Sequence, residues 1–345
     1  MDNNDIKVSV CCLVYNHEKY LRKCLDGFVM QKTNFAFEVL INDDKSTDSS
    51  AEIIKEYYEK YPDIFVPVFQ TENQYSKSVC ITDDILIPMA KGKYIAFCEG
   101  DDYWCDENKL QLQYDYMEND EECVMCLHNT VFHYLDGSHK DRLFNNWKDS
   151  HILNEEEVFL GWTVHTSSYF IRKEYAKAPD FGRKCIAGDM VRRTWLYTIG
   201  KLVSLPQIMS VYNAGVENGA MDRVNKAVKG NEKFSLEAIN YYKELNIATE
   251  YKFSDIIEKT INYWSFNILC HEKSDIIKNS NDKKEIISAA KAITSHEYYR
   301  DFIKGKPGLN RICTHFKYEG YIIYPLWRFA YLLYYGRKQN KRKSQ

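Results

Sequence analysis

Residues 92–104 have the sequence GKYIAFCEGDDYW, in which an apolar run is followed by a pair of aspartates. Its apolar run, Tyr94–Cys98, predicts a strand that is buried on both faces. The carboxylates that follow, Asp101 and Asp102, are costly beside a buried strand unless they bind something. Because hard divalent cations prefer oxygen ligands, both are candidates for holding Mn²⁺ or Mg²⁺ on a diphosphate. The alternative is an acidic turn that caps the following helix.

Strand-like and helix-like segments alternate upstream of this stretch. Continuous apolar runs predict strands at residues 8–14, 37–41 and 66–69. Apolar residues at helical spacing predict helices at residues 21–29, 53–61 and 81–89. The alternation predicts an α/β fold with a Rossmann-like, mostly parallel sheet over residues 6–105. In such sheets ligands bind beyond the carboxyl ends of the strands.

Downstream the pattern is looser. It predicts a helix at 109–117, strands at 124–134 and 167–171, a turn at 136–137 and a helix at 190–198. Few Gly or Pro residues interrupt 231–296, which is therefore predicted to be helical. Residues 321–335 are dense in aromatic and aliphatic side chains but shorter than the roughly 20 apolar residues that span a bilayer. With the basic residues that follow, they are predicted to lie in a membrane interface, and a docked terminal helix is the alternative.

Polar residues follow the predicted strands at the edge where ligands are expected. The first strand is followed by Tyr15-Asn16 and the second by Asp43 and Asp44. Two carboxylates at a sheet edge are more than a helix cap requires, so both are predicted to bind a ligand. Asp44 is suited to accept a hydrogen bond from the N–H of a nucleotide base. Thr47 and Asp48 are predicted to cap the next helix.

Several function classes are disfavoured by what the sequence lacks. There is no GxGxxG after the first strand and no GxxxxGK[ST], which argues against a nicotinamide dehydrogenase and a P-loop NTPase. Neither GxSxG nor HExxH occurs. The formal net charge of −3 gives no case for binding nucleic acid.

The 11 cysteines, several of them in predicted strands, and the absence of an opening secretory signal indicate a reducing cytoplasm. Cys123 and Cys126 have CxxC spacing, but a structural zinc site needs a second pair nearby. Both are therefore predicted to lie in the core of a strand.

Three motifs together carry a resemblance to a known family. VSVCCLVYN (8–16), FEVLINDDKSTDSS (37–50) and GKYIAFCEGDDYW resemble, in order and spacing, the family-2 glycosyltransferases of bacteria. HTSSYFIRKE (165–174) and GDMVRRTWLYTIGKL (188–202) resemble the acceptor-side half of that family. The resemblance covers roughly residues 6–215 and implies the A-type glycosyltransferase (GT-A) fold and, for most members, inversion at the anomeric carbon.

The resemblance also implies roles for individual residues. Asp44 would contact the base, normally uracil, and Tyr15-Asn16 would line the nucleotide pocket. Asp102 would bind the metal, with Asp101 beside it. Asp189 would be the general base, whereas a helix cap before Met190 is its structural alternative.

Two positions depart from the family pattern. Lys45 stands where DDGSTD has glycine, so that turn is expected to differ. Tyr212-Asn213 stands where the family often has Tyr-Arg, so a diphosphate contact is missing or comes from elsewhere. Arg192 and Arg193 are candidates for supplying it, but we predict that they lie on the helix surface.

Three ring-bearing residues near these motifs have two interpretations each. A histidine helps to hold the metal or the acceptor in some relatives, yet a structural role is favoured for His165. Trp104 and Trp162 could stack on sugar rings, and core packing explains them equally well.

The chain is predicted to comprise four segments. They are a nucleotide-sugar-binding half (1–106), an acceptor-binding half (107–228), a helical region (229–300) and an aromatic and basic segment (301–345). The expected location is the cytoplasm, with peripheral contact at the inner face of the cell membrane, and the oligomeric state stays open.

The predicted function is metal-dependent transfer of a sugar, with inversion, from a UDP-sugar or other nucleotide sugar. The acceptor would be a hydroxyl of a glycan or lipid-linked glycan in bacterial surface polysaccharide synthesis. A sugar-phosphate nucleotidyltransferase would need a glycine-rich, basic loop after the first strand, where this chain has YNHE. A non-catalytic module that binds a nucleotide or sugar is the remaining alternative.

Overall fold

The protein is described by a computed structural model of residues 5–77, 79–183, 185, 187–216 and 230–270. The chain divides into two compact units, Met1–Asp222 and Arg223–Gln345. In the second unit, α8 (Gly230–Ala248) and α9 (Ser254–Cys270) pack against each other. The aromatic and basic segment 301–345 lies outside the described residues. None of the helices within the described ranges has the length and apolarity needed to cross a membrane.

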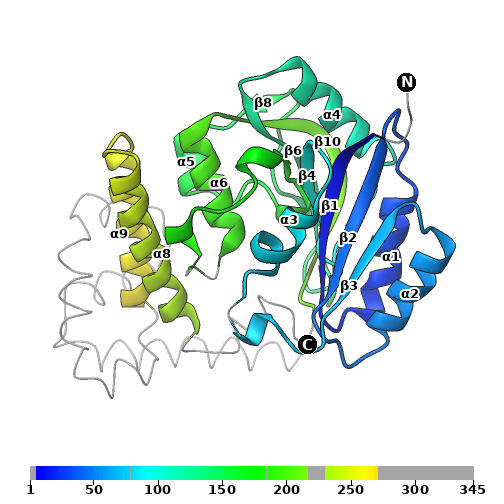
Figure 1. Cartoon of the computed structure of the whole chain (residues 1–345). Helices are drawn as coiled ribbons and strands as arrows, with labels where there is room; N and C mark the ends of the chain where they lie inside the picture. Colours follow the sequence, from blue (N-terminus) through cyan, green and yellow to red (C-terminus); the bar gives the residue numbers. More distant parts are fainter. Residues whose placement is uncertain (1–4, 78, 184, 186, 217–229, 271–345) are drawn as a thin grey trace. The chain divides into compact units, whose positions relative to one another are not determined.

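The first unit is built on one sheet of ten strands (Figure 1). In chain order they are β1 (Ile6–Val14), β2 (Ala36–Asp43), β3 (Phe65–Phe69), β4 (Tyr94–Phe97), β5 (Tyr103–Trp104), β6 (Cys123–Tyr134), β7 (Arg142–Leu143), β8 (His151–Ile152), β9 (Phe170–Arg172) and β10 (Lys201–Ala214). Their order across the sheet is β3-β2-β1-β4-β9-β6-β10-β5, with β7 beside β6 and β8 beside β10. Strands β3, β2, β1 and β4 are parallel, which confirms the predicted α/β fold with a mostly parallel sheet.

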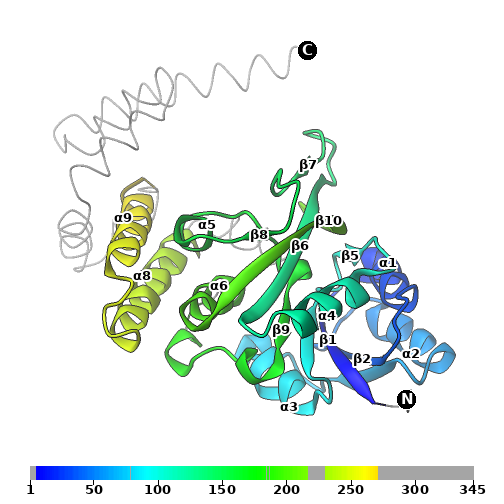
Figure 2. The ribbon, with the colours of Figure 1, turned by 90° about the horizontal axis from the view of Figure 1, so that it is seen from above.

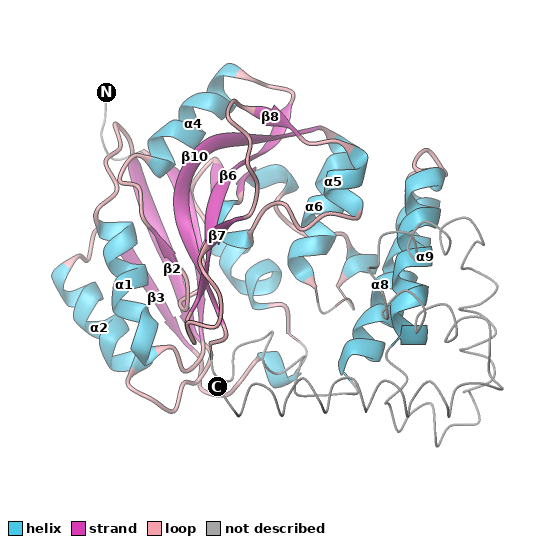
Figure 3. Cartoon of the chain, turned by 180° about the vertical axis from the view of Figure 1, so that it is seen from behind, coloured by secondary structure: helices cyan, strands magenta, loops and turns pink. Residues whose placement is uncertain are grey.

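Helices cover both faces of this sheet. They are α1 (Glu18–Val29), α2 (Ser50–Lys60), α3 (Ile87–Met89), α4 (Lys109–Asn119), α5 (Glu155–Phe159) and α6 (Gly188–Ile199). Figures 1 and 3 show α1 and α2 on one side of the sheet and α6 on the other. In Figure 2 the two longest strands, β6 and β10, run side by side, as their parallel pairing requires.

The continuous apolar runs explain why the central strands form where the sequence predicts them. Residues 8–12 of β1 are buried on both faces of the sheet. On α1, Leu21, Leu25 and Phe28 are buried on a stripe at helical spacing. Phe28 meets the ring of Trp104 edge-on, with the ring centroids 4.8 Å apart, and Trp104 is itself fully buried. This packing fixes the chain just beyond the acidic residues that follow β4.

The downstream half departs from the predicted pattern in two places. The strand predicted at 167–171 is shorter, because Thr166–Ser168 forms a 3₁₀ turn and β9 begins only at Phe170. The 14-residue strand β10 is absent from the prediction. Its register shifts between Leu205 and Ile208, and Pro206 lies inside that irregularity, where the ladder does not need its N–H. The CxxC pair is buried in β6, as predicted for strand core.

Lys109 is a buried lysine in the core of the first unit. Its Nζ donates to Gln113 Oε1 at 2.7 Å and lies 4.0 Å from the ring centroid of Trp104. Burial lowers the pKa of Lys109 to about 7. Above that pH the folded chain holds the amine neutral, whereas the unfolded chain keeps its proton up to the ordinary value of 10.5. The unfolded state then binds more protons, so this group makes the free energy of unfolding rise with pH.

Replacing Lys109 with methionine should remove this pH dependence. We expect the wild type to gain, relative to the variant, about 1.4 kcal/mol of unfolding free energy per pH unit between roughly pH 7.5 and 9.5. Urea unfolding across that range measures the difference, with exposed Lys19→Met on α1 as the control. Parallel pH profiles for wild type and Lys109→Met would contradict the assignment.

Candidate active site

The ends of β1, β2 and β4 meet at one edge of the sheet. Val14 of β1 pairs with Asp43 of β2, and the amide of Asp44 donates to Val14 O at 2.9 Å. On the other side of β1, the amide of Gly100 donates to Leu13 O at 2.9 Å. The acidic turn after β4 therefore lies beside the end of β1, on the side opposite Asp43, which ends β2, and Asp44, which follows it.

Glu99, Asp101 and Asp102 form the carboxylate cluster. One oxygen from each lies within 4.8 Å of the others. Asp102 is 2% exposed, and Asp101 Oδ1 is buried with no hydrogen-bond partner among the described residues. Three oxygen donors with an unpartnered buried atom fit a hard divalent cation better than they fit a helix cap.

The carboxyl groups of the carboxylate cluster disfavour one another's charge. Burial, and then the charge of Asp101, raises the pKa of Asp102 well above its usual range. Glu99 keeps some exposed surface, but the surrounding protein displaces much of the water near its carboxyl group, which disfavours the ionised form. The negative charges of Asp101 and Asp189 disfavour that form further. Together these effects raise the pKa of Glu99 to about 8. A cation would reverse these shifts, because it stabilises the ionised forms.

Asn213, at the end of β10, holds the acidic turn. Its amide N–H donates to Asp102 Oδ1 at 2.9 Å, and its side-chain Nδ2 donates to the carbonyl of Asp101 at 2.6 Å. This residue stands where the resemblance implies an arginine that contacts the diphosphate. The asparagine instead contacts the residues of the carboxylate cluster. The carboxylate cluster also affects the neighbouring Tyr212. Burial, and then the charges of Asp102 and Asp101, raises the pKa of this tyrosine.

His165 faces the same carboxylate from the other side. Its Nε2 lies 3.7 Å from Asp102 Oδ2, and the side chain is buried. Its Nδ1 lies 2.9 Å from Ser167 Oγ, which in turn lies 2.8 Å from Ser210 Oγ. Burial lowers the pKa of His165 to about 3, so the ring is neutral at physiological pH. The predicted structural role is present, and the same ring approaches the carboxylate cluster.

Asp189 is the second residue of α6. The helix begins at Gly188 with Ala187 as its N-cap, so Asp189 does not cap it, contrary to the structural alternative. Its carboxylate makes no hydrogen bond to any residue in the described part of the chain, and it is half-buried. Its charge contributes to the raised pKa of Glu99, which puts it in electrostatic reach of the carboxylate cluster.

The prediction that Arg192 and Arg193 lie on the helix surface is wrong. They are 8% and 5% exposed. Arg192 donates to the carbonyl of Ala176 and forms a buried ion pair with Asp83. Arg193 donates to carbonyl groups in the 158–161 segment. Both guanidinium groups have partners in the fold, which the helical pattern alone does not reveal.

The aspartates that end β2 are engaged in local hydrogen bonds. Asp44 accepts from the amides of Gln74 and Tyr75 at 2.6 and 3.1 Å. These use two of the roughly four lone-pair sites of a carboxylate. Asp43 accepts from the amide of Ser46, and its Oδ1 is buried without a partner among the described residues. Burial raises the pKa of Asp43.

The loops after β1 and β2 are joined through Asn16. Its side-chain Oδ1 accepts from the amide of Thr47 at 2.7 Å, and its own amide donates to Ser46 Oγ. Lys45 has φ 62°, the left-handed conformation that glycine adopts most readily, so the turn keeps the glycine-like backbone despite the substitution. Asp48 accepts from the first amides of α1 and α2, but the N-cap of α2 is Ser49. Thr47, which was also predicted to cap that helix, donates its hydroxyl to Asn16 Oδ1 instead. Tyr15 is half-buried beside this junction.

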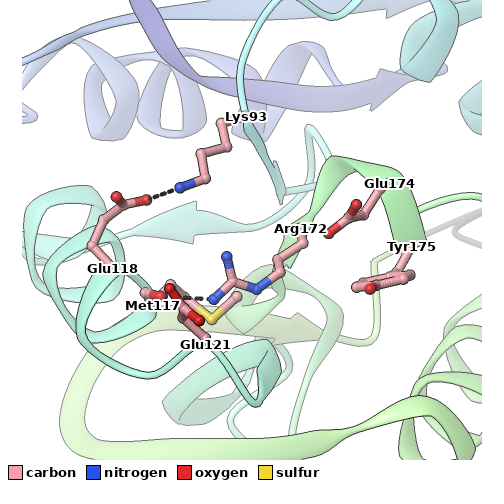
Figure 4. A pocket seen from close by; sticks show the side chains of 7 residues that line it. All are labelled: Lys93, Met117, Glu118, Glu121, Arg172, Glu174 and Tyr175. Atoms are coloured by element: carbon pink, nitrogen blue, oxygen red, sulfur yellow. Dashed lines mark hydrogen bonds and ion pairs between the residues drawn. The ribbon is translucent and has the colours of Figure 1, made fainter.

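The cavity drawn in Figure 4 is lined by Lys93, which precedes β4, and by Arg172, which ends β9. It measures about 250 Å³. Its arginine, Arg172, donates to the carbonyl groups of Cys123, Met117 and Asp120. These hydrogen bonds to the main chain give the guanidinium a structural role. The residues that line the cavity include none of the carboxylate cluster.

Part of the chain is similar to a known family of proteins. The model of "Glycosyl transferase family 2" matches residues 9–178. An uncharacterized protein of Mycobacterium tuberculosis is 33% identical over 210 residues, which are 59% of this chain and 58% of the relative. The poly(ribitol-phosphate) beta-glucosyltransferase of Bacillus spizizenii is 36% identical over 121 residues, 35% of this chain and 19% of that enzyme. The chain thus spans less than two thirds of the length of either relative.

A solved structure shares the fold. The crystal structure of S. aureus TarS 1-349 in complex with UDP-GlcNAc matches with a TM-score of 0.62 and 15% identity, over 90% of this chain and 87% of that chain. The likeness confirms the predicted GT-A architecture. The matched segment, residues 9–178, belongs to glycosyl transferase family 2 and carries the carboxylate cluster and β2 to β9 in full.

Proposed function

We propose that the protein transfers a sugar from a nucleotide sugar, preferably a UDP-sugar, to a hydroxyl of a glycan or lipid-linked glycan, with inversion and with a divalent cation. The observation that carries the proposal is the carboxylate cluster, which has Asp189 in electrostatic reach and lies at the edge of the sheet where ligands bind. The complex of TarS with UDP-GlcNAc supports the choice of donor. The B. spizizenii relative is named for glucosyl transfer to poly(ribitol-phosphate), which supports a hydroxyl-bearing polymer as the acceptor.

Asp102 and Asp101 would hold Mn²⁺ or Mg²⁺, and His165 faces the same point. When bound, the cation would offset the negative charge that grows on the diphosphate as it leaves. Asp44, with Asp43 and Tyr15-Asn16, would contact the nucleotide from the ends of β1 and β2. The remaining lone pairs of Asp44 suit the N–H of a base.

Asp189 would act as the general base. As the acceptor oxygen attacks the anomeric carbon, the bond from that carbon to the diphosphate oxygen breaks, and the hydroxyl proton passes to the Asp189 carboxylate. Attack from the side opposite the leaving group inverts the configuration, so an α-linked donor gives a β-linked product. A carboxylate that neither caps its helix nor pairs with a described residue is free for this task.

Release of nucleoside diphosphate from a panel of nucleotide sugars tests the proposal. We expect slow hydrolysis of one UDP-sugar with Mn²⁺ and none with a chelator. Metal-dependent binding without turnover on any donor, with or without acceptors, would indicate the non-catalytic module instead. Hydrolysis that persists in chelator would contradict the role of the cation.

The contacts of Asn213 predict that its side chain supports the cation site. In Asn213→Ala the amide N–H to Asp102 remains, but the bond to the carbonyl of Asp101 is lost. We expect about a tenfold loss of Mn²⁺ affinity, as for other residues that orient metal ligands, measured by calorimetry. Gln31→Ala, which removes buried side-chain amide bonds elsewhere, is the control for lost stability. Equal Mn²⁺ affinities in all three proteins would contradict this role.

A further inference from the structure

Trp162 is a large aromatic side chain that is fixed and yet exposed. It is 45% exposed, while its ring contacts those of Phe132, Phe144 and Tyr212 with centroids 5.7, 5.2 and 6.0 Å apart. All three contacts are T-shaped, with interplanar angles of 84°, 88° and 71°. No aromatic ring among the described residues is therefore stacked in parallel on the indole. The three neighbours hold it in place and leave nearly half of its surface open.

This indole is connected to the carboxylate cluster through two rings. Tyr212 contacts Trp162 on one side and His165 on the other, where the ring centroids are 4.4 Å apart. His165 lies 3.7 Å from Asp102. The residue after Tyr212 is Asn213, which holds the acidic turn. A ligand lying on Trp162 would thus extend along the edge of the same site that holds the reacting groups.

The sheet order indicates which substrate would lie there. The ends of β1 and β2, where the nucleotide is proposed to bind, are on one side of β4 in the sheet. Trp162 packs against side chains of β6 and β10, on the other side of β4. The donor occupies the first side in our proposal, so the acceptor is the substrate that approaches from the second.

The chemistry of the patch suits a hydroxylated ring. Sugar rings present C–H groups on their faces and hydroxyl groups at their edges, so an aromatic surface with a hydrogen-bond donor nearby matches them. Arg142 provides the hydrogen-bond donor, because its exposed guanidinium lies 4.2 Å from the ring centroid of Phe132 and 5.7 Å from that of Phe144. Trp147, by contrast, already has a partner, since it is stacked on His151 at 4.1 Å and 21°.

We propose that Trp162 is the stacking platform of an acceptor subsite that takes a sugar ring of the glycan acceptor. This proposal rests on the proposed function, because it names the substrate that lies opposite the donor. It differs from the core-packing alternative for Trp162, and it leaves Trp104 in the core, where its Nε1 donates to Ser167 O at 3.0 Å.

Steady-state kinetics of Trp162→Ala and Trp162→Phe test the proposal, with Trp147→Ala as the control. The acceptors are p-nitrophenyl glycosides of glucose, galactose and N-acetylglucosamine, with the donor that the wild type hydrolyses. We expect the KM for the acceptor to rise about tenfold in Trp162→Ala and to be partly restored in Trp162→Phe, while the KM for the donor stays within about twofold.

The outcomes separate the two proposals. An acceptor KM that is the same in Trp162→Ala and wild type would overturn the subsite and leave the proposed function intact. Transfer by the wild type to none of these glycosides, despite donor hydrolysis, would also overturn the sugar-ring assignment. Absence of any donor hydrolysis in the wild type would instead contradict the proposed function.

Discussion

Replacing Asp189 with asparagine is expected to reduce sugar transfer about a thousandfold while leaving Mn²⁺-dependent binding of the donor unchanged. A positioned general base contributes about 10² to 10⁴ in rate, and asparagine has the shape of aspartate but cannot take the proton. The Asp189 carboxylate has no hydrogen-bonding partner in the described part of the chain, so its loss breaks no contact of the fold. Single-turnover transfer and calorimetry with the donor measure the two effects separately.

The matched control is Asp180→Asn, an exposed aspartate in the 3₁₀ turn Asp180–Gly182 that precedes α6. It should transfer at the wild-type rate. A rate in Asp189→Asn within tenfold of wild type would rule out the assignment of Asp189 as the base. Loss of donor binding in that variant would show that Asp189 acts on the donor instead.

Asp102→Asn is expected to abolish metal-dependent donor binding, weakening it at least about a hundredfold, because an amide oxygen is a poorer ligand for a hard cation than a carboxylate. The asparagine can still accept the bond from the amide of Asn213. The pKa of Asp102 is raised in the fold, so its charge costs stability at neutral pH when no cation is bound. The metal-free variant should therefore unfold at a higher temperature than metal-free wild type.

This pairing of effects distinguishes a lost ligand from a damaged fold. Weaker donor binding together with a lower melting temperature in Asp102→Asn would indicate a damaged fold. Donor binding equal to that of the wild type would contradict the assignment of Asp102 as a metal ligand. Asp115→Asn on the exposed side of α4 is the control, and it should change neither quantity.

The parts of the fold that the sequence predicts are those with local signals. Strands β1, β2 and β4 are continuous apolar runs, and α1 carries its buried residues at helical spacing. Strand β10 was not predicted, because Pro206 and exposed Gln207 and Ile208 interrupt its pattern. Its pairing with β6 decides that it is a strand, and that pairing joins segments about eighty residues apart.

The candidate site divides in the same way. Asp101 and Asp102 are adjacent in the sequence, so their shared position after a strand is visible there. Asn213 lies 111 residues after Asp102 and 112 residues after Asp101 in the sequence, so no local pattern predicts its contacts with them. Glu99 was visible within the acidic motif but was not predicted to join the carboxylate cluster. Arg192 was misjudged because its partner, Asp83, lies on a distant helical turn.

In the proposed function, the carboxylate cluster holds a divalent cation against the diphosphate of a nucleotide. Anomalous diffraction from crystals grown with Mn²⁺ and UDP tests this role. We predict one anomalous peak at a carboxylate oxygen of Asp102, at about 2.1 Å, shared with the diphosphate oxygens. A nucleotide bound with no manganese at Asp102, or manganese bound only elsewhere on the chain, would contradict the cation-binding role of the carboxylate cluster.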